Sequence, residues 1–545
     1  MPDIPARLIP RVLLYAENLL REDLIFTGGD MKYDYIVLGA GSAGSIIATR
    51  LSEDPDKNIL LLEAGPDYPD FEQLPEEVKF GYATEIDIMV SDHNWQFIGK
   101  ATETAPEMMV PRGKVTGGSS AINGQVFLRG VPEDYDSWAE MGNTEWRFQD
   151  CLPYFRMIET DTDFSDDFHG TEGPIVMHRF PRDTWHPATE AFYQACRAAG
   201  YPDAPDHNNP DSTGVGPTPL NNPNGIRMST ALGYLDQIRH RLNVTIRANC
   251  HVQRILFEGR RAIGVEVESG GETFTVEGSE IVLSSGAIGS PHILMLSGVG
   301  PAAQLEEFGI PVVHDVPGVG QNLRDHPLVF VTWRTKPEVE LDGNAPRMQA
   351  TLRYTAGGSN LRNDMKVSMQ SFATERINRG GDRMVPLGIR MSTGIQLAAG
   401  AGELRLQSAD PSVQPRLDYH YLEEEFDRAR LRETVRICVA LGEDPAFKDI
   451  IQERIEPTDA ELATDEALDE FLYREVTTSQ HISCTCKMGP SSDPMAVVDQ
   501  YGKVHGMENL RVVDASIMPD CIRANTNVTT MMIGERVADW IKQGK

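Results

Sequence analysis

Three closely spaced glycines near the start of the chain constrain its fold more than any other feature. A short apolar run at 35–38 is followed at once by Gly39, Gly41 and Gly44 in the spacing GxGxxG. A helical stretch at 45–52 and a second apolar run, which ends on Glu63, come next. This order of strand, tight turn, helix and strand predicts the βαβ unit that binds dinucleotides.

Each residue of this unit has a physical role. The first glycine lets the backbone turn sharply, the second lets it approach a pyrophosphate, and the third lets the helix lie close to the sheet. The N–H groups at the helix start favour phosphate, and Glu63 can accept hydrogen bonds from the adenosine ribose while disfavouring NADP. The unit predicts binding of an ADP moiety, which FAD and NAD share. Its candidate residues are Gly39, Gly41, Ser42, Ala43, Gly44, Glu63 and Ala64.

The composition is that of a large globular protein. The chain has 545 residues, of which 40% are hydrophobic and 24% charged, enough for two or three domains. The net charge of −31 repels polyanions, so no nucleic-acid partner is expected. Seven scattered cysteines and a start without a signal-peptide layout favour a reducing, cytoplasmic location. No run approaches the roughly 20 apolar residues of a membrane-spanning helix.

Residues 1–30 have a pattern of their own. Apolar residues recur at helical spacings up to the Gly28–Gly29 pair, which predicts an amphipathic N-terminal extension. Its apolar face must be covered by something. Docking on the domain surface is the favoured interpretation, and peripheral contact with the inner membrane is the alternative.

Three further groups of motifs lie later in the chain. They are GKVTGGSSAIN at 113–123 with 130–138, SGAIGSPHILMLSGVG at 285–300, and a C-terminal group at 481–489, 510–516 and 525–530. Together with the glycine turn, they resemble the glucose-methanol-choline (GMC) oxidoreductase family of flavin enzymes over residues 33–541. The C-terminal motifs resemble its choline-dehydrogenase branch.

The resemblance implies an α/β fold with two interwoven domains. A Rossmann-like FAD-binding domain is expected from 31–165, 225–325 and 470–545, and an antiparallel-sheet substrate domain from 166–224 and 326–469. Small residues in the 117–123 stretch would let the backbone approach the cofactor. The candidate FAD-binding residues that the resemblance adds are Gly113, Gly117, Gly118, Ser119, Asn123, Gly124, Val252, Asp514, Ala515, Asn527, Val528 and Thr529.

The same resemblance bears on how the flavin is held. In some family members a histidine of the 113–123 stretch is bonded covalently to the flavin. The matching position here is Ile122, so non-covalent FAD is expected. A helix that opens near Val528 would direct its N-terminal dipole at the flavin N1–C2=O edge.

The resemblance also implies the chemistry. His481 matches the family's catalytic histidine, and Asn527 is interpreted as its partner, which would orient the substrate oxygen. A neutral imidazole can accept a hydroxyl proton near neutral pH. The expected reaction is oxidation of a primary alcohol to the aldehyde by hydride transfer to flavin N5, with a quinone-like carrier or O₂ as final acceptor. His326 is interpreted as structural, and no metal is expected at His481, Cys484 and Cys486, which lack an evident fourth ligand.

Substrate charge separates the remaining alternatives. Choline-oxidising relatives carry an acidic residue soon after an Asp-His pair, whereas the Asp-His-Pro run at 325–327 is followed here by Leu328. Loss of that charge should weaken selection of a cation. A neutral primary alcohol is therefore expected. Choline dehydrogenase is the alternative, as is a flavoprotein of the same fold that does not oxidise alcohols, such as a photodecarboxylase or a lyase. The sequence predicts no oligomeric state.

Overall fold

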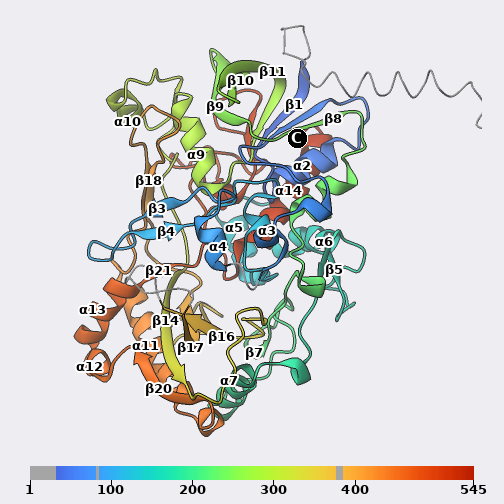
Figure 1. The fold of residues 1–545 in the computed structure, drawn as a ribbon. Helices are drawn as coiled ribbons and strands as arrows, with labels where there is room; N and C mark the ends of the chain where they lie inside the picture. The colour runs from blue at the N-terminus through green and yellow to red at the C-terminus, as the bar shows by residue number, and fades with distance from the viewer. Residues whose placement is uncertain (1–31, 82–84, 376–384) are drawn as a thin grey trace, which may run out of the picture. The chain divides into compact units, whose positions relative to one another are not determined.

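Two seven-stranded sheets organise the molecule (Figure 1). The computed structural model describes residues 32–81, 85–375 and 385–545, so the helix predicted within residues 1–30 lies outside the described part. Residues 33–545 form one compact unit. Among the described helices, none is both long enough and apolar enough to cross a membrane.

The first sheet contains the predicted βαβ unit. Its strands run in the order β8, β2, β1, β11, β10, β9, and β22 pairs with the far side of β11. The pairs from β8 to β11 and the pair of β11 with β22 are parallel, while β9 and β10 extend β11 as an antiparallel ribbon. The strands are β1 (Tyr33–Leu38), β2 (Ile59–Leu62), β8 (Val244–Arg247), β9 (His251–Glu258), β10 (Arg261–Ser269), β11 (Glu272–Leu283) and β22 (Leu510–Val512).

The second sheet is antiparallel. Its order is β20, β14, β17, β16, β15, β7, and β21 pairs with β14. Helix α11 (Glu425–Gly442) packs against β17 in the lower part of Figure 1, opposite the face that lines the cavity described below. The strands are β7 (Gly214–Pro217), β14 (Pro327–Thr335), β15 (Ala350–Tyr354), β16 (Met365–Thr374), β17 (Pro386–Ile395), β20 (Ile451–Glu456) and β21 (Thr477–Thr478).

The chain passes repeatedly between the two sheets. Strands β7 and β14 enter the second sheet on either side of the β8–β11 segment, and β21 pairs there shortly before β22 joins the first sheet. This confirms the expected α/β class with an interwoven antiparallel sheet. The residue boundaries of the two predicted domains stay a prediction.

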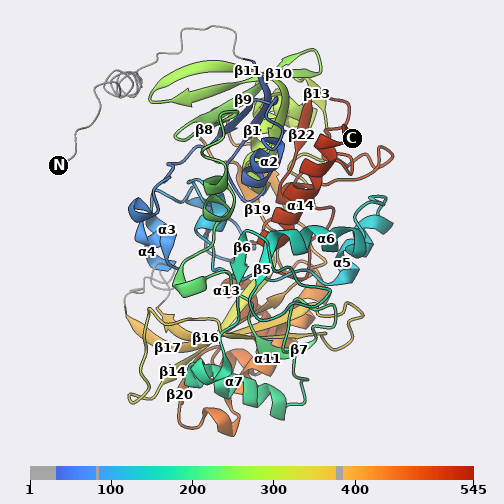
Figure 2. The same ribbon diagram turned by 90° about the vertical axis from the view of Figure 1, so that its right-hand side faces the viewer.

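Helix α14 (Thr526–Lys542) connects the C-terminus to the nucleotide-binding side. It packs against α2 (Gly44–Leu51) and α6 (Phe148–Ile158), and Figure 2 shows the three helices beside one another. The approach to α2 is close because Gly534 has no side chain; a Cβ atom there would lie 3.2 Å from the Cα of Ala43. The start of α14 is thereby brought to the glycine turn.

The remaining helices and short strands connect the sheets. The helices are α3 (Glu76–Lys79), α4 (Glu85–Val90), α5 (Pro132–Glu140), α7 (Pro187–Ala198), α8 (Thr230–Gly233), α9 (Gly286–Leu296), α10 (Ala302–Glu307), α12 (Asp459–Leu462) and α13 (Asp465–Glu475). The short strands form the pairs β3 (Phe97–Gly99) with β4 (Met108–Val110), β5 (Glu159–Asp161) with β6 (Ile175–Met177), β12 (Val299–Gly300) with β13 (His314–Asp315), and β18 (Glu403–Arg405) with β19 (Arg416–Asp418).

Candidate active site

One large cavity receives residues from both sheets. Its volume is about 1070 Å³, at the upper end of the range for small-molecule pockets. One end lies at the glycine turn of the βαβ unit, and the other lies against the cavity-facing side of β14, β16 and β17. The predicted site residues that line it are Gly39, Gly41, Ser42, Ala43, Glu63, Ala64, Gly113, Gly118, Ser119, Asn123, Gly124, Val252, His481, Asp514, Ala515 and Asn527.

Two glycine-rich loops meet backbone to backbone at the nucleotide end. Gly39 has a φ of +99° and Gly118 a φ of +52°, a region that favours glycine. A Cβ atom on Gly118 would lie 2.6 Å from the Cα of Gly41, so a larger residue would push the loops apart. The backbone is therefore open to a close-lying ligand, which fits the diphosphate of a dinucleotide cofactor.

Glu63 ties this end of the cavity together. Its carboxylate accepts hydrogen bonds from the backbone N–H groups of Ala40 and Gly65, each at 2.9 Å. Burial raises the pKa of Glu63 to about 7, although both backbone bonds act in the opposite direction. The acidic residue that the sequence pattern places at the ribose thus also fixes the two turns on either side.

Four predicted site residues, Gly44, Gly117, Val528 and Thr529, do not line the cavity. Gly44 serves helix packing, since a Cβ atom there would lie 1.9 Å from the carbonyl oxygen of Gly39. The hydroxyl of Thr529 lies 2.8 Å from that of Tyr135, in the protein interior. Gly117 donates its backbone N–H to the loop at Ala40, and Val528 is fully buried. These residues support the cavity from behind instead of facing it.

Asp514 lines the cavity but uses its carboxylate within the protein. Oδ2 accepts hydrogen bonds from the backbone of Gly286 at 2.9 Å and from the hydroxyl of Ser290 at 2.5 Å. Oδ1 accepts from the backbone of Ser516 at 2.8 Å. The side chain therefore joins the loop after β22 to the start of α9.

A chain of hydrogen bonds crosses the other end of the cavity. The Nε2 of His326 lies 2.8 Å from the backbone carbonyl of Ile522, and its Nδ1 lies 2.9 Å from the Nδ1 of His481. The Nε2 of His481 lies 2.9 Å from the amide nitrogen of Asn525. The amide oxygen of Asn525 accepts a hydrogen bond from the Nζ of Lys366, also at 2.9 Å.

The two ends of this chain fix the direction of every bond in it. A backbone carbonyl can only accept, so His326 carries its proton on Nε2 and, when neutral, accepts at Nδ1. His481 must then donate from Nδ1 and hold a lone pair on Nε2. A lysine can only donate, so Lys366 faces the oxygen of Asn525, and the amide N–H points at that lone pair. His481 thus presents a basic nitrogen to the cavity.

Charge in this region favours neutral imidazoles. Burial lowers the pKa of His481 well below its ordinary value, and His326, Lys366 and Arg112 lower it further. Burial and Lys366 lower the pKa of His326 to about 3. The backbone N–H groups of His481 and His326 both donate to Asp325, at 2.9 and 2.7 Å, which positions the two rings together.

The structure corrects the assigned partner of His481. Asn525 contacts His481, whereas the side chain of Asn527 accepts a hydrogen bond from the hydroxyl of Ser42 at 2.7 Å. Both asparagines lie at the start of α14, but Asn525 is its N-cap residue and makes no side-chain cap. Its amide is directed to His481 and Lys366 instead. The interpretation of His326 as merely structural also missed its contact with His481.

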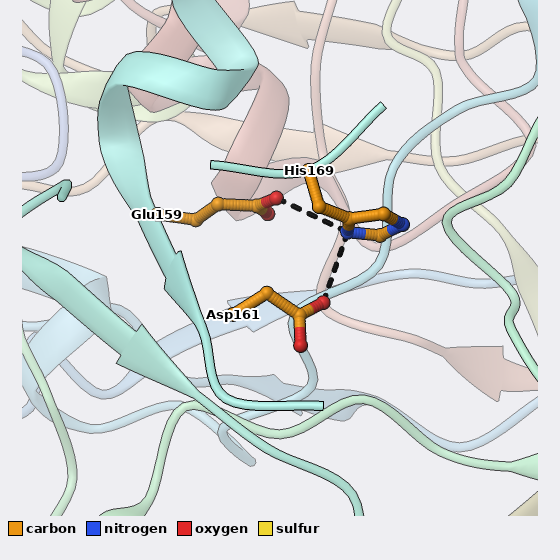
Figure 3. A group of neighbouring side chains, drawn as sticks. All are labelled: Glu159, Asp161 and His169. Carbon is orange, nitrogen blue, oxygen red and sulfur yellow. Dashed lines mark ion pairs between the residues drawn. The ribbon is translucent and has the colours of Figure 1, made fainter. Parts of the chain in front are cut away.

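A second cluster of ionisable residues lies at β5. Among the residues that the structure describes, Glu159, Asp161 and His169 form the one group of His, Cys or acidic side chains close enough to share a metal ion. Figure 3 shows the His169 ring between the two carboxylates, with Nδ1 at 3.3 Å from Glu159 and 2.9 Å from Asp161. Arg129 and Arg179 form ion pairs with the same carboxylates. Cations of the protein already occupy these ligand atoms, which makes the cluster an ion-pair network.

We expect His169→Ala to destabilise the fold. Burial alone would lower the pKa of His169, but Asp161, Asp206 and Glu159 outweigh it and raise the pKa to about 11. Removing a buried partner leaves uncompensated charge and costs about 3–5 kcal/mol of unfolding free energy. The imidazolium contribution is complete below its ordinary pKa of 6.5 and is lost as pH rises through 11.

Denaturant unfolding at pH 7 and at pH 10.5 to 11 would check this prediction. The loss in the variant should be large at the lower pH and smaller at the higher one. The exposed His240→Ala is the matched control and should change little at either pH. Equal stability of His169→Ala and the unmodified protein would contradict the ion-pair assignment.

Comparison with known proteins agrees with this architecture. Family models described as GMC oxidoreductase match residues 33–328 and 399–534. The chain is 40% identical to the oxygen-dependent choline dehydrogenase of Escherichia coli K12, over 94% of this chain and 96% of the relative. Among solved structures, pyridoxine 4-oxidase from Mesorbium loti has a TM-score of 0.86 at 28% identity, covering 94% of this chain and 99% of that one.

A further solved structure shares the fold at lower identity. Formate oxidase has a TM-score of 0.85 at 24% identity and covers 95% of this chain and 99% of its own. The two family models together span the nucleotide end, the loop of His326 and the start of α14. The cavity, its glycine loops and the imidazole at its far end therefore belong to a flavin oxidoreductase: this chain is a member of the GMC oxidoreductase family.

Proposed function

We propose that this protein oxidises a primary alcohol to the aldehyde with non-covalent FAD. The observation that carries the proposal is the hydrogen-bond chain that leaves a lone pair on the Nε2 of His481 at the cavity. FAD, when bound, supplies the acceptor for the two electrons and the hydrogen that leave the carbinol carbon. The glycine loops would hold its diphosphate, and Glu63 its ribose.

In this proposal His481 acts as the general base. Its Nε2 takes the hydroxyl proton of the substrate, and its Nδ1–H continues to donate to His326. The imidazolium that forms is stabilised because the facing Nδ1 of His326 is an acceptor. A neutral base is available over a wide pH range because the pKa of His481 is lowered.

Asn525 positions the substrate oxygen. Its amide nitrogen and the Nε2 of His481 are 2.9 Å apart, so an oxygen at hydrogen-bond distance from both would complete a triangle. The amide would donate to this oxygen while His481 accepts its proton. Lys366 keeps the amide from turning over, because the lysine can only face the amide oxygen.

The manner of flavin binding follows from the 113–123 stretch. Ile122 lines the cavity at the position where the resemblance would place a flavin-bonding histidine. An aliphatic side chain offers no nucleophile, which supports a non-covalent cofactor. Full release of FAD into the supernatant on acid denaturation is the expected result, and flavin that stays with the precipitate would contradict it.

The acceptor and the substrate are supported by different observations. The Escherichia coli relative is named as oxygen-dependent, so O₂ and a quinone-like carrier are the acceptors to test. Choline is the second candidate substrate, favoured by the 40% identity with that enzyme. The apolar Leu328 on the cavity wall argues against it, because it offers no carboxylate to a quaternary ammonium group.

Anaerobic mixing of the purified flavoprotein with a panel of alcohols tests the proposal. We expect primary alcohols to bleach the flavin absorbance, and oxygen or a soluble quinone to restore it. A flavoprotein that no alcohol reduces would favour a light-driven decarboxylase or a lyase on this fold. A panel in which choline alone works would establish the second candidate.

A further inference from the structure

We propose that Lys366 makes this active site select an alcohol with a carboxylate close to its carbinol carbon, a short hydroxy acid, over neutral and cationic alcohols. The inference rests on the proposed function and names its substrate class. It also changes the expectation of a neutral alcohol, which considered position 328 alone.

Strand register places the lysine on the substrate wall. Lys366 of β16 pairs with Gly394 of β17, which in turn pairs with Leu328 of β14. All three line the cavity and form one row across the sheet. Adjacent strands lie about 4.8 Å apart, so the row spans roughly 10 Å. Its apolar residue and its glycine contribute no charge, and the ammonium group is the one ionisable group that the row presents.

The ammonium group has no counter-ion within the described part of the chain. Its one hydrogen bond there runs to the amide oxygen of Asn525, and no described carboxylate lies within 4.0 Å of Nζ. An ammonium has three donors, so two remain for the oxygens of a ligand. Burial, with Arg353 as a further cause, lowers the pKa of Lys366 to about 7. A carboxylate in the cavity would offset that cost of burying the charge.

The lysine and the base are linked through a single side chain. Asn525 bonds Lys366 through its amide oxygen and His481 through its amide nitrogen. A hydroxyl at His481 and a carboxylate at Lys366 must therefore lie within the span of one small molecule. Two carbons between them, as in 3-hydroxypropionate, match this separation. A quaternary ammonium group at the same place would face a like charge.

A second cavity cation provides a matched control. Arg390 lies on the same wall, two rows farther along β17, and pairs in register with Gln370. Its Nε donates to Gln370 at 2.6 Å, and its guanidinium lies 4.3 Å from the centre of the Phe330 ring. Arg390→Met thus removes a positive charge from the wall without touching the row of Lys366.

The test compares three primary alcohols of similar size with the FAD-loaded protein and with Lys366→Met, Lys366→Arg and Arg390→Met. The alcohols are 3-hydroxypropionate, 3,3-dimethyl-1-butanol and choline, an anion, a neutral molecule and a cation. We expect the unmodified protein to prefer 3-hydroxypropionate. Lys366→Met should raise its KM about 10- to 100-fold and leave the KM of the neutral alcohol within about threefold. Lys366→Arg should keep the preference for the anion, and Arg390→Met should change it less than Lys366→Met.

Two results would overturn the inference. An equal fall of kcat for all three alcohols in Lys366→Met would show that the lysine acts only by orienting Asn525. No preference for the anion in the unmodified protein, with the neutral alcohol oxidised normally, would refute the substrate class while leaving alcohol oxidation intact.

A binding measurement keeps the inference separate from the proposed reaction. Propionate lacks the hydroxyl group and cannot be oxidised at a carbinol, and its binding can be followed by the change in flavin absorbance. Loss of this binding in Lys366→Met, but not in Arg390→Met, would support anion recognition even if no alcohol reduced the flavin. Equal propionate affinity in Lys366→Met and the unmodified protein would refute it.

Discussion

Replacing His481 with glutamine is expected to slow flavin reduction by alcohol about 10³-fold. The substitution keeps a polar side chain of similar length but removes the lone pair that the chain from Ile522 through His326 directs at the cavity. General-base catalysis contributes about 10²- to 10⁴-fold to a proton transfer. Anaerobic stopped-flow measurement of flavin bleaching at saturating alcohol reports this step directly.

The control for this variant must separate chemistry from binding. The visible spectrum should show FAD bound at the unmodified level, because the cofactor loops at Gly39 and Gly118 lie at the other end of the cavity. His240→Ala, at an exposed position, should bleach at the normal rate. Flavin reduction by His481→Gln within tenfold of the unmodified rate would remove this residue from the mechanism.

Much of the nucleotide end could be predicted because its signals are local. The run before Gly39, the glycine spacing and the acidic end at Glu63 occupy about 30 consecutive residues, and each has a role that chain geometry alone requires. The observed β1, α2 and β2 follow this order. Gly44 and Gly117 were assigned to the ligand because close packing of helix and loop needs the same residue type as close approach to a phosphate.

The catalytic end was predicted less completely because its contacts depend on register between distant strands. Lys366 belongs to no motif, and it reaches the cavity through its place in β16, opposite Gly394 of β17. His326 and His481 are 155 positions apart, and they meet because the loop before β14 and the segment after β21 share Asp325 as a backbone acceptor. Spacing in the sequence carries no trace of such a contact.

The two asparagines at the start of α14 show the limit of motif reading. In Asn525-Thr526-Asn527 either amide could serve His481, and the motif does not distinguish them. Two residues on a helix correspond to about 200° of rotation, so the side chains diverge. The first reaches His481, and the second reaches Ser42 on the glycine turn.

This divergence makes a matched pair of variants informative. We expect Asn525→Ala to lower kcat/KM for alcohol about 10²- to 10³-fold, the usual cost of one donor to a reacting oxygen. The variant also leaves Lys366 without its amide acceptor. Asn527→Ala should lower the rate of flavin reduction less than tenfold, because its amide oxygen bonds Ser42 and not the base. Stopped-flow bleaching with the same alcohol measures both.

Asn525→His adds a test of what the amide supplies. An imidazole N–H at this position would restore a donor to the substrate oxygen, so this variant should retain more activity than Asn525→Ala. All variants are compared at equal bound FAD, which the visible spectrum measures. A larger loss in Asn527→Ala than in Asn525→Ala would reverse the assignment. The helix start would then act through its second asparagine, with the contact between Asn525 and His481 restricted to the substrate-free site.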